Sequence, residues 1–182
     1  MNHDAIVDLF TSVRKYPGIL GIRTDFFACP TVKSAPTTVK AISEIMGIDG
    51  NHPGYVETVL ETVSPHLVKS IMPGKVKPYT IEEWPDVIDD ALGILHDNHW
   101  ITVASMMTGL PKETEKDVIE SIEFIDRINH HNVFVWVFPL ICHSGRCART
   151  RPNGHPSTRR CARSCDTERH ENLCRHDRKA VV

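Results

Sequence analysis

Two places in the sequence bring together residue types that bind small polar ligands. Glu61 and Ser64 stand at the end of one strand-like apolar run, and Gly109 stands in the turn that ends the next. A carboxylate or hydroxyl at a strand end can bond a ligand, and free backbone amides where a helix begins favour anionic and polar groups. The structural interpretation of the same residues is a solvated or paired surface carboxylate at Glu61, a helix cap at Ser64 and an ordinary turn at Gly109-Leu110-Pro111.

A third group of chemically capable residues lies in the segment 143–182, which with Cys142 holds five of the six cysteines. Cys161, Cys165, His170 and Cys174 have the spacing C-x3-C-x4-H-x3-C, which has the ligand types of a zinc site without a recognised zinc-knuckle spacing. A second set of the same types is Cys142, His143, Cys147 and His155. A zinc module is one interpretation of this segment.

Two other interpretations of residues 143–182 remain. The arginines at 159, 160, 163 and 169 permit a basic arm for nucleic acid, although no aromatic residues are interleaved with them. The segment also has one leucine and no isoleucine, phenylalanine or tryptophan, so we expect it to be disordered. Residues 1–142 carry 11 Lys+Arg and 19 Asp+Glu, whereas residues 143–182 carry 10 and 4. This abrupt change favours an out-of-frame or post-truncation extension.

Residues 1–142 alternate between helix and strand patterns. The predicted strands are Ile19 to Ala28, Tyr55 to Glu61, Trp100 to Met107 and Val133 to Leu140. The predicted helices are His3 to Lys15, one capped by Ser34 that starts at Pro36, one capped by Ser64, Trp84 to Leu95 after a Thr80–Glu83 capping box, and one capped by Thr114 and Asp117. Trp84 and Trp136 are expected in the core. About four parallel strands with covering helices give an α/β fold, either a piece of a larger β/α barrel or a small open sheet.

Composition limits the class of protein. No run of eighteen apolar residues occurs, and the acidic, amphipathic start MNHDAIVDLF lacks the order of a secretion signal. We therefore expect a cytoplasmic protein without a membrane partner.

Three motifs in this α/β stretch occur in a familiar order. They are Glu-Thr-x-Ser-Pro at Glu61 to Pro65, Met-x-Gly-Lys at Met72 to Lys75, and Gly-Leu-Pro-x-Glu-Thr at Gly109 to Thr114. Together they resemble the C-terminal half of the radical SAM barrel. They are most similar to the archaeal branch whose longer members often carry a cobalamin-binding domain in front. The resemblance covers residues 2 to 141 and implies a partial, TIM-like parallel β/α barrel over residues 1–142.

The resemblance also implies a cofactor and a role for each candidate residue. Radical SAM enzymes bind S-adenosylmethionine across the barrel strands, beside a [4Fe-4S] cluster, and use both for radical chemistry. Glu61 and Ser64 would then face the ribose and the amino-acid portion of the cofactor. Met107, Gly109 and Leu110 would hold the edge of the adenine.

Two departures from the family pattern bear on activity. The cluster-binding motif C-x3-C-x2-C is absent, because Glu168 follows the pair Cys161 and Cys165 where a third cysteine would stand. Cys29 is alone in an apolar run, which is typical of a small core residue. Lys112 replaces the usual glycine of the Gly-Leu-Pro turn.

We therefore expect a chain that begins about halfway through the barrel and is inactive alone. A separately encoded N-terminal half would be its partner. The alternative from a different class is a small α/β binding module with a zinc-binding basic tail that contacts nucleic acid, and a structural domain without a ligand is a further one.

Overall fold

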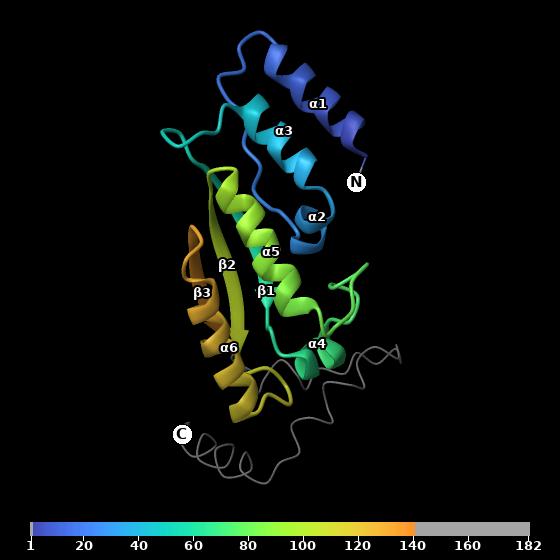
Figure 1. Ribbon diagram of the computed structural model, residues 1–182, viewed down its shortest axis with the longest axis vertical. Coiled ribbons are helices and arrows are strands. Elements are labelled where there is room, and N and C mark those ends of the chain that lie inside the picture. Colours follow the sequence, from blue (N-terminus) through green and yellow to red (C-terminus); the bar gives the residue numbers. More distant parts are fainter. Residues whose placement is uncertain (1, 141–182) are drawn as a thin grey trace, which may run out of the picture. The chain divides into compact units, whose positions relative to one another are not determined.

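The computed structural model describes residues 2–140, and every zinc and nucleic-acid candidate predicted above lies outside that range (Figure 1). The helices and strands, in order, are α1 His3–Lys15, α2 Cys29–Ser34, α3 Pro36–Met46, β1 Gly54–Glu61, α4 Pro65–Ile71, α5 Trp84–Asp97, β2 Trp100–Thr108, α6 Glu115–Ile128 and β3 Val133–Pro139. No helix within residues 2–140 is both long enough and apolar enough to cross a membrane.

The three strands form one parallel sheet in the order β1-β2-β3. Parallel neighbours need crossover connections, and here α4 and α5 lie between β1 and β2 in sequence while α6 lies between β2 and β3. Gly54 pairs with Trp100 and Thr102 pairs with Val133, so the register is continuous until an irregularity between Val59 and Glu61. The predicted α/β class and the strands β1, β2 and β3 are confirmed.

The predicted fourth strand, Ile19 to Ala28, is wrong. Only Phe26 forms a parallel bridge with Glu57, supported by backbone hydrogen bonds from Phe27 to Glu57 at 3.0 Å and from Glu57 to Asp25 at 2.9 Å. Leu20 is 97% exposed, which shows that the apolar residues at the start of this segment find no described layer to pack against. Without that burial an apolar run does not become a strand.

The helix boundaries follow the predicted caps except at α3. The Thr114–Asp117 capping box is present, and the Thr80–Glu83 pair forms both of its reciprocal bonds just before α5. Ser34, however, does not cap α3. It ends the unexpected helix α2, and its hydroxyl donates to the Pro30 carbonyl at 2.6 Å. Ala35 occupies the N-cap position of α3.

The core lies between one face of the sheet and the helices. Val56 and Leu60 of β1 and Ala104 and Met106 of β2 join Trp84 in a single cluster. The α5 and α6 side chains in that cluster are Val87, Ile88, Ala91, Leu92, Leu95, Phe124 and Ile128. Trp84 is 1% exposed, as predicted, and its Nε1–H donates to the Thr62 carbonyl at 2.9 Å. The buried indole therefore keeps its hydrogen bond.

The opposite face of the sheet has no such cover among residues 2–140. Tyr55 of β1 and Phe134, Trp136 and Phe138 of β3 are 42 to 61% exposed. Trp136 was expected in the core, but it is 54% exposed and stacks on Phe138 with ring centroids 5.0 Å apart. Its position explains the error, because β3 alternates between the two faces and Trp136 falls on the uncovered one. We call this surface the open face.

The packing around Gly54 at the start of β1 leaves no room for a side chain. A Cβ added at Gly54 would lie 2.6 Å from Ile48 Cδ1 and 2.6 Å from Trp100 Cε3. Trp100 is 1% exposed and its Nε1–H is held by Ser43, so the ring cannot swing away. We expect Gly54→Ala to lower the free energy of unfolding by about 1–3 kcal/mol in urea titrations.

The matched control is Gly74→Ala, because a Cβ at Gly74 meets no atom within 4 Å. That change should stay within about 0.5 kcal/mol of the parent chain. Equal losses for the two variants would contradict the close approach at Gly54.

Candidate functional site

Glu61 ends β1 at the carboxyl edge of the sheet. It follows the register irregularity and has a φ of 63°, a left-handed conformation that is unusual for a non-glycine residue. Its Oε1 lies 3.6 Å from Lys75 Nζ, and both side chains remain about a quarter to a third exposed. Burial lowers the pKa of Lys75, and the Glu61 charge works against that shift. This ion pair brings the motif Met72 to Lys75 into contact with the motif Glu61 to Pro65.

Ser64 lies close by but points into the protein. It occupies the N-cap position of α4, as predicted, although its side chain makes no capping bond. Its hydroxyl instead donates to Asp117 Oδ1, and both residues are buried. This contact joins the first motif to the helix that follows the third.

Asp117 is the centre of this network. Its Oδ2 accepts from the Thr114 backbone N–H at 2.8 Å and from the Thr114 hydroxyl at 2.6 Å, and His66 Nδ1 lies 3.5 Å from its Oδ1. Burial by itself would raise the pKa of Asp117, but the hydrogen bonds from Ser64 and Thr114 outweigh it and lower that pKa to about 2. The carboxylate is therefore ionised at neutral pH and holds the starts of α4 and α6 together.

The turn after β2 carries the remaining predicted residues. Gly109 has a φ of 77° and its N–H donates to Glu113 Oε2 at 2.6 Å, while the Thr108 hydroxyl donates to the same oxygen at 3.1 Å. Leu110 is buried at 8% exposure. Lys112 has a φ of 71°, a left-handed conformation that glycine adopts most easily, and it stands where the radical SAM pattern predicts glycine.

Met107 adjoins the open face. Its partner in β3 is Phe138, and Ser105 pairs with Trp136 two residues earlier. Met106, the neighbour of Met107, points the other way into the core and is 2% exposed. Glu61 and Met107 therefore lie at the carboxyl ends of adjacent strands. Met107 is on the open side, and Glu61 pairs in register with Met106 after the irregularity in β1. Ser64 and Leu110 are buried.

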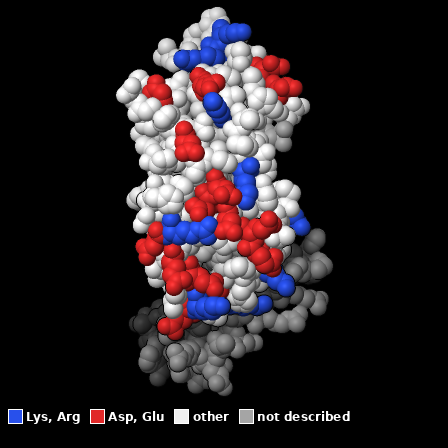
Figure 2. Space-filling view, in the orientation of Figure 1, with Lys and Arg blue, Asp and Glu red and all other residues white. Residues whose placement is uncertain are grey.

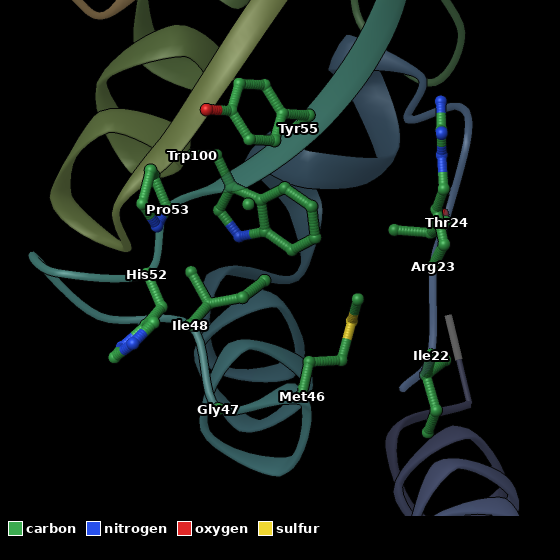
Figure 3. Close-up of a pocket in the computed structure, with 11 residues that line it drawn as sticks. Ile22, Arg23, Thr24, Met46, Gly47, Ile48, His52, Pro53, Tyr55 and Trp100 are labelled. Carbon is green, nitrogen blue, oxygen red and sulfur yellow. The ribbon is translucent and has the colours of Figure 1, made fainter. Parts of the chain in front are cut away.

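A sizeable hollow lies elsewhere in the described residues. A pocket of about 510 Å³ at the amino end of β1 is lined by side chains from Ile22 to Thr24, from the end of α3 and from Trp100 (Figure 3). Its charged residue, Arg23, pairs with Asp25 in an ion pair that is more than 80% exposed. Since ligands in parallel α/β sheets bind at carboxyl ends, this pocket is a less suitable site than the edge near Glu61.

The sequence did not identify Asp117 and Glu113 as members of the site. Asp117 was recognised only as a helix cap, because a local pattern shows the bond to Thr114 but not the bond to Ser64. Glu113 stands inside the third motif, and its acidic side chain five residues after Thr108 was the available signal.

A scan against protein-family models and a search of curated proteins found no match to this chain. The radical SAM resemblance thus stays a prediction from the chain's own motifs.

The Asp117 network predicts a pH-dependent stability. The folded pKa of about 2 lies below the ordinary value of 3.8, so the stabilisation by Asp117 is complete above pH 4 and disappears as the pH falls towards 2. We expect Asp117→Asn to lower the free energy of unfolding by roughly 2 kcal/mol at pH 7, with a difference from the parent chain that shrinks steadily below pH 4.

Asp126→Asn is the control on the same helix, since Asp126 is exposed and has no ion-pair or hydrogen-bond partner among the described residues. It should leave stability unchanged at pH 7. A loss for Asp117→Asn that is the same at pH 3 as at pH 7 would show that the network does not depend on the charge.

The left-handed backbone at Lys112 predicts that a mutation to glycine stabilises the protein. Lys112→Gly removes the left-handed strain of a side-chain-bearing residue, so we expect the free energy of unfolding to rise by up to about 1 kcal/mol. Lys40→Gly, at an exposed position inside α3, should lower it by about 1 kcal/mol. Chemical denaturation of both variants checks the opposite signs, and a loss at both positions would rule out the strained turn.

Proposed function

We propose that residues 2–140 are the C-terminal half of a radical SAM barrel and bind S-adenosylmethionine at the carboxyl edge of the sheet. The observation that carries this proposal is the open face, with Met107 at its carboxyl end and Glu61 at the end of the neighbouring strand. In a closed parallel barrel the face opposite the helices is packed inside, and ligands bind where the strands end. The N-terminal half of the barrel would supply the strands that cover this face.

The convergence of the three motifs supports the proposal. They are separated in sequence, yet Glu61 meets Lys75, and Ser64 meets Asp117 just after the Gly109 to Thr114 motif. The left-handed backbone at Lys112 adds support, because glycine, the usual residue of radical SAM proteins at this place in the turn, adopts that conformation most easily.

The residues present fit S-adenosylmethionine in part. The partly exposed Glu61 carboxylate is suited to accept hydrogen bonds from ribose hydroxyls or from the amino group. Met107 offers apolar surface to an adenine ring, and the exposed Gly109 lets a ligand approach the backbone closely. Ser64 is committed to Asp117 and Leu110 lies under the turn, so we assign both a positioning role.

The residues do not fit a [4Fe-4S] cluster. Cys29 is the one cysteine among residues 2–140; it is 3% exposed and lies 3.2 Å from the Thr58 hydroxyl. Burial raises the pKa of its thiol to about 11, whereas iron binds the thiolate. A cluster, like any cobalamin, would have to be held by another part of the enzyme.

Because the cluster would be held elsewhere, residues 2–140 would contribute only to the binding of S-adenosylmethionine. S-adenosylmethionine supplies the radical chemistry when it is bound beside a reducing cluster. Glu61, Met107 and Gly109 bind and orient it, and the Ser64–Asp117 contact keeps the edge in place. We therefore expect no catalysis by this chain alone.

Thermal unfolding with and without S-adenosylmethionine tests the proposal. A ligand that binds the folded chain raises the midpoint by mass action, and the rise should grow with ligand concentration. Glu61→Gln should reduce the rise several-fold at a fixed concentration, because it removes the charge and one acceptor.

The matched control is Glu57→Gln, which changes an exposed glutamate on the same strand, nearer its amino end. It should keep the full rise. No rise for the parent chain at millimolar S-adenosylmethionine, or an equal reduction in both variants, would contradict binding at Glu61.

A further inference from the structure

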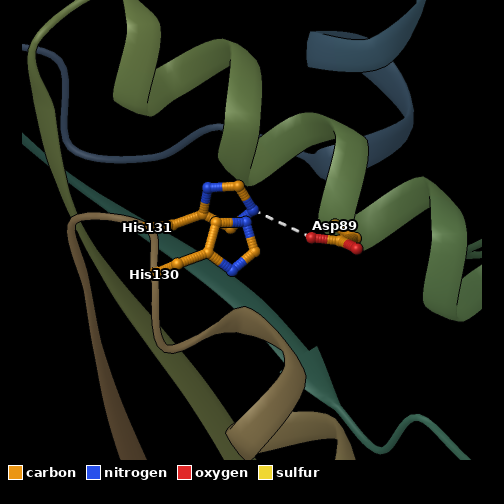
Figure 4. A group of neighbouring side chains, drawn as sticks. All are labelled: Asp89, His130 and His131. Atoms are coloured by element: carbon orange, nitrogen blue, oxygen red, sulfur yellow. Dashed lines mark hydrogen bonds and ion pairs between the residues drawn. The ribbon is translucent and has the colours of Figure 1, made fainter.

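A second cluster of chemically active side chains lies at the amino edge of the sheet, away from Glu61. Asp89 comes from α5, and His130 and His131 come from the turn between α6 and β3 (Figure 4). One carboxylate oxygen and one nitrogen from each ring all lie within 4.8 Å of one another. The two imidazoles face each other with centroids 3.9 Å apart.

The hydrogen bonds leave suitable atoms for a metal ion. His130 Nδ1 lies 2.9 Å from the Arg127 carbonyl. A carbonyl only accepts, so Nδ1 carries the proton and Nε2 keeps a free lone pair. Fixing one ring nitrogen on a backbone carbonyl is the usual way in which a protein orients a metal-binding histidine.

His131 and Asp89 already share a contact that an ion can replace. His131 Nε2 lies 2.8 Å from Asp89 Oδ1. Ligand atoms around a tetrahedral zinc ion are about 3.3 Å apart, since Zn–N and Zn–O bonds are about 2.0–2.1 Å long. An ion between these atoms would take the place of the bridging proton, which moves to Nδ1 or to solvent, and small side-chain rotations would complete the geometry.

Arg127 holds the Asp89 carboxylate through the oxygen that does not contact His131. Its Nε donates to Asp89 Oδ2 at 2.8 Å, and its terminal nitrogen donates to Asp86 at 2.7 Å. Hydrogen bonds to the second oxygen of a ligating carboxylate hold it in position. Asp86 offsets the Arg127 charge, so Arg127 does not by itself make the cluster repel a cation.

The surroundings are also acidic. Asp90 and Asp97 line a hollow together with Asp89 and His131, and Lys33 is paired with Asp90 at 2.7 Å. Acidic side chains gather in the middle of the surface shown in Figure 2. Three aspartates and one lysine line this hollow, a balance that favours the approach of a divalent cation.

We propose that Asp89, His130 and His131 bind Zn²⁺, with water in the fourth position. Two imidazoles and one carboxylate suit zinc, whereas magnesium and calcium prefer oxygen ligands alone. His96 lies beside the cluster but is not a fourth ligand, because its Nδ1 accepts the Asn132 N–H and its other nitrogen therefore carries the proton. The ion ties α5 to the turn that starts β3.

Zinc titration of the full chain by calorimetry tests this site. Thiols are first alkylated, so that the cysteines at 142 and beyond cannot contribute. We expect one zinc per chain, a rise in the unfolding midpoint with zinc, and an affinity at least tenfold weaker in His130→Ala. His130 is exposed and bonds only within its own turn, so this change should leave the metal-free stability intact.

Two controls separate ligation from structure. His99→Ala removes an exposed histidine outside the cluster and should bind zinc as the parent does. Asp89→Asn should weaken zinc binding, whereas Asp97→Asn on the same helix should leave it within about twofold. The proposal is overturned if the alkylated parent binds no zinc, or if His130→Ala and His99→Ala bind it equally. Neither result bears on S-adenosylmethionine binding, which concerns the opposite edge of the sheet.

Discussion

The structure depends on a parallel sheet that packs its helices against only one face. Leu60, Ala104 and Met106 face the helices and are no more than 2% exposed, whereas Trp136 and Phe134 on the other face are more than half exposed. Parallel sheets are normally covered on both faces. Within residues 2–140 no second layer covers the sheet. The helix side forms a buried core, whereas the other side is an exposed apolar surface. The proposed half-barrel would explain both properties, because a closed parallel barrel packs the face opposite the helices inside.

A buried carboxylate determines the shape of the carboxyl edge. Asp117 accepts hydrogen bonds from Ser64 at the start of α4 and from Thr114 at the start of α6, so two loops that follow neighbouring strands are fixed to one another. The bond also withdraws Ser64 from any ligand. What remains accessible is Glu61, Met107 and Gly109, which is a smaller ligand set than the motifs imply.

The features predicted correctly from the sequence are those that depend on neighbouring residues, such as helix periodicity and helix caps. The 3.6-residue periodicity located α5 and α6, and the pairs Thr80–Glu83 and Thr114–Asp117 located their starts. The arrangement of the two candidate sites depends instead on contacts between residues that are distant in sequence. Ser64 meets Asp117 across 53 residues and His131 meets Asp89 across 42, so neither pair has a local signal. The exposure of Trp136 was equally hidden, because an apolar strand does not reveal which layers exist to cover it.

The adjacent residues Met106 and Met107 allow the most direct test of the central claim, which is that the open side of the sheet at its carboxyl edge binds S-adenosylmethionine. Met106 is 2% exposed in the helical core, while Met107 is partly exposed on the open side. The measurement is a methyl NMR titration of methionine-labelled protein with S-adenosylmethionine. We predict a saturable shift of the Met107 methyl and a much smaller one for Met106. An unchanged Met107 signal at saturating ligand, or equal shifts at both methyls, would contradict the account.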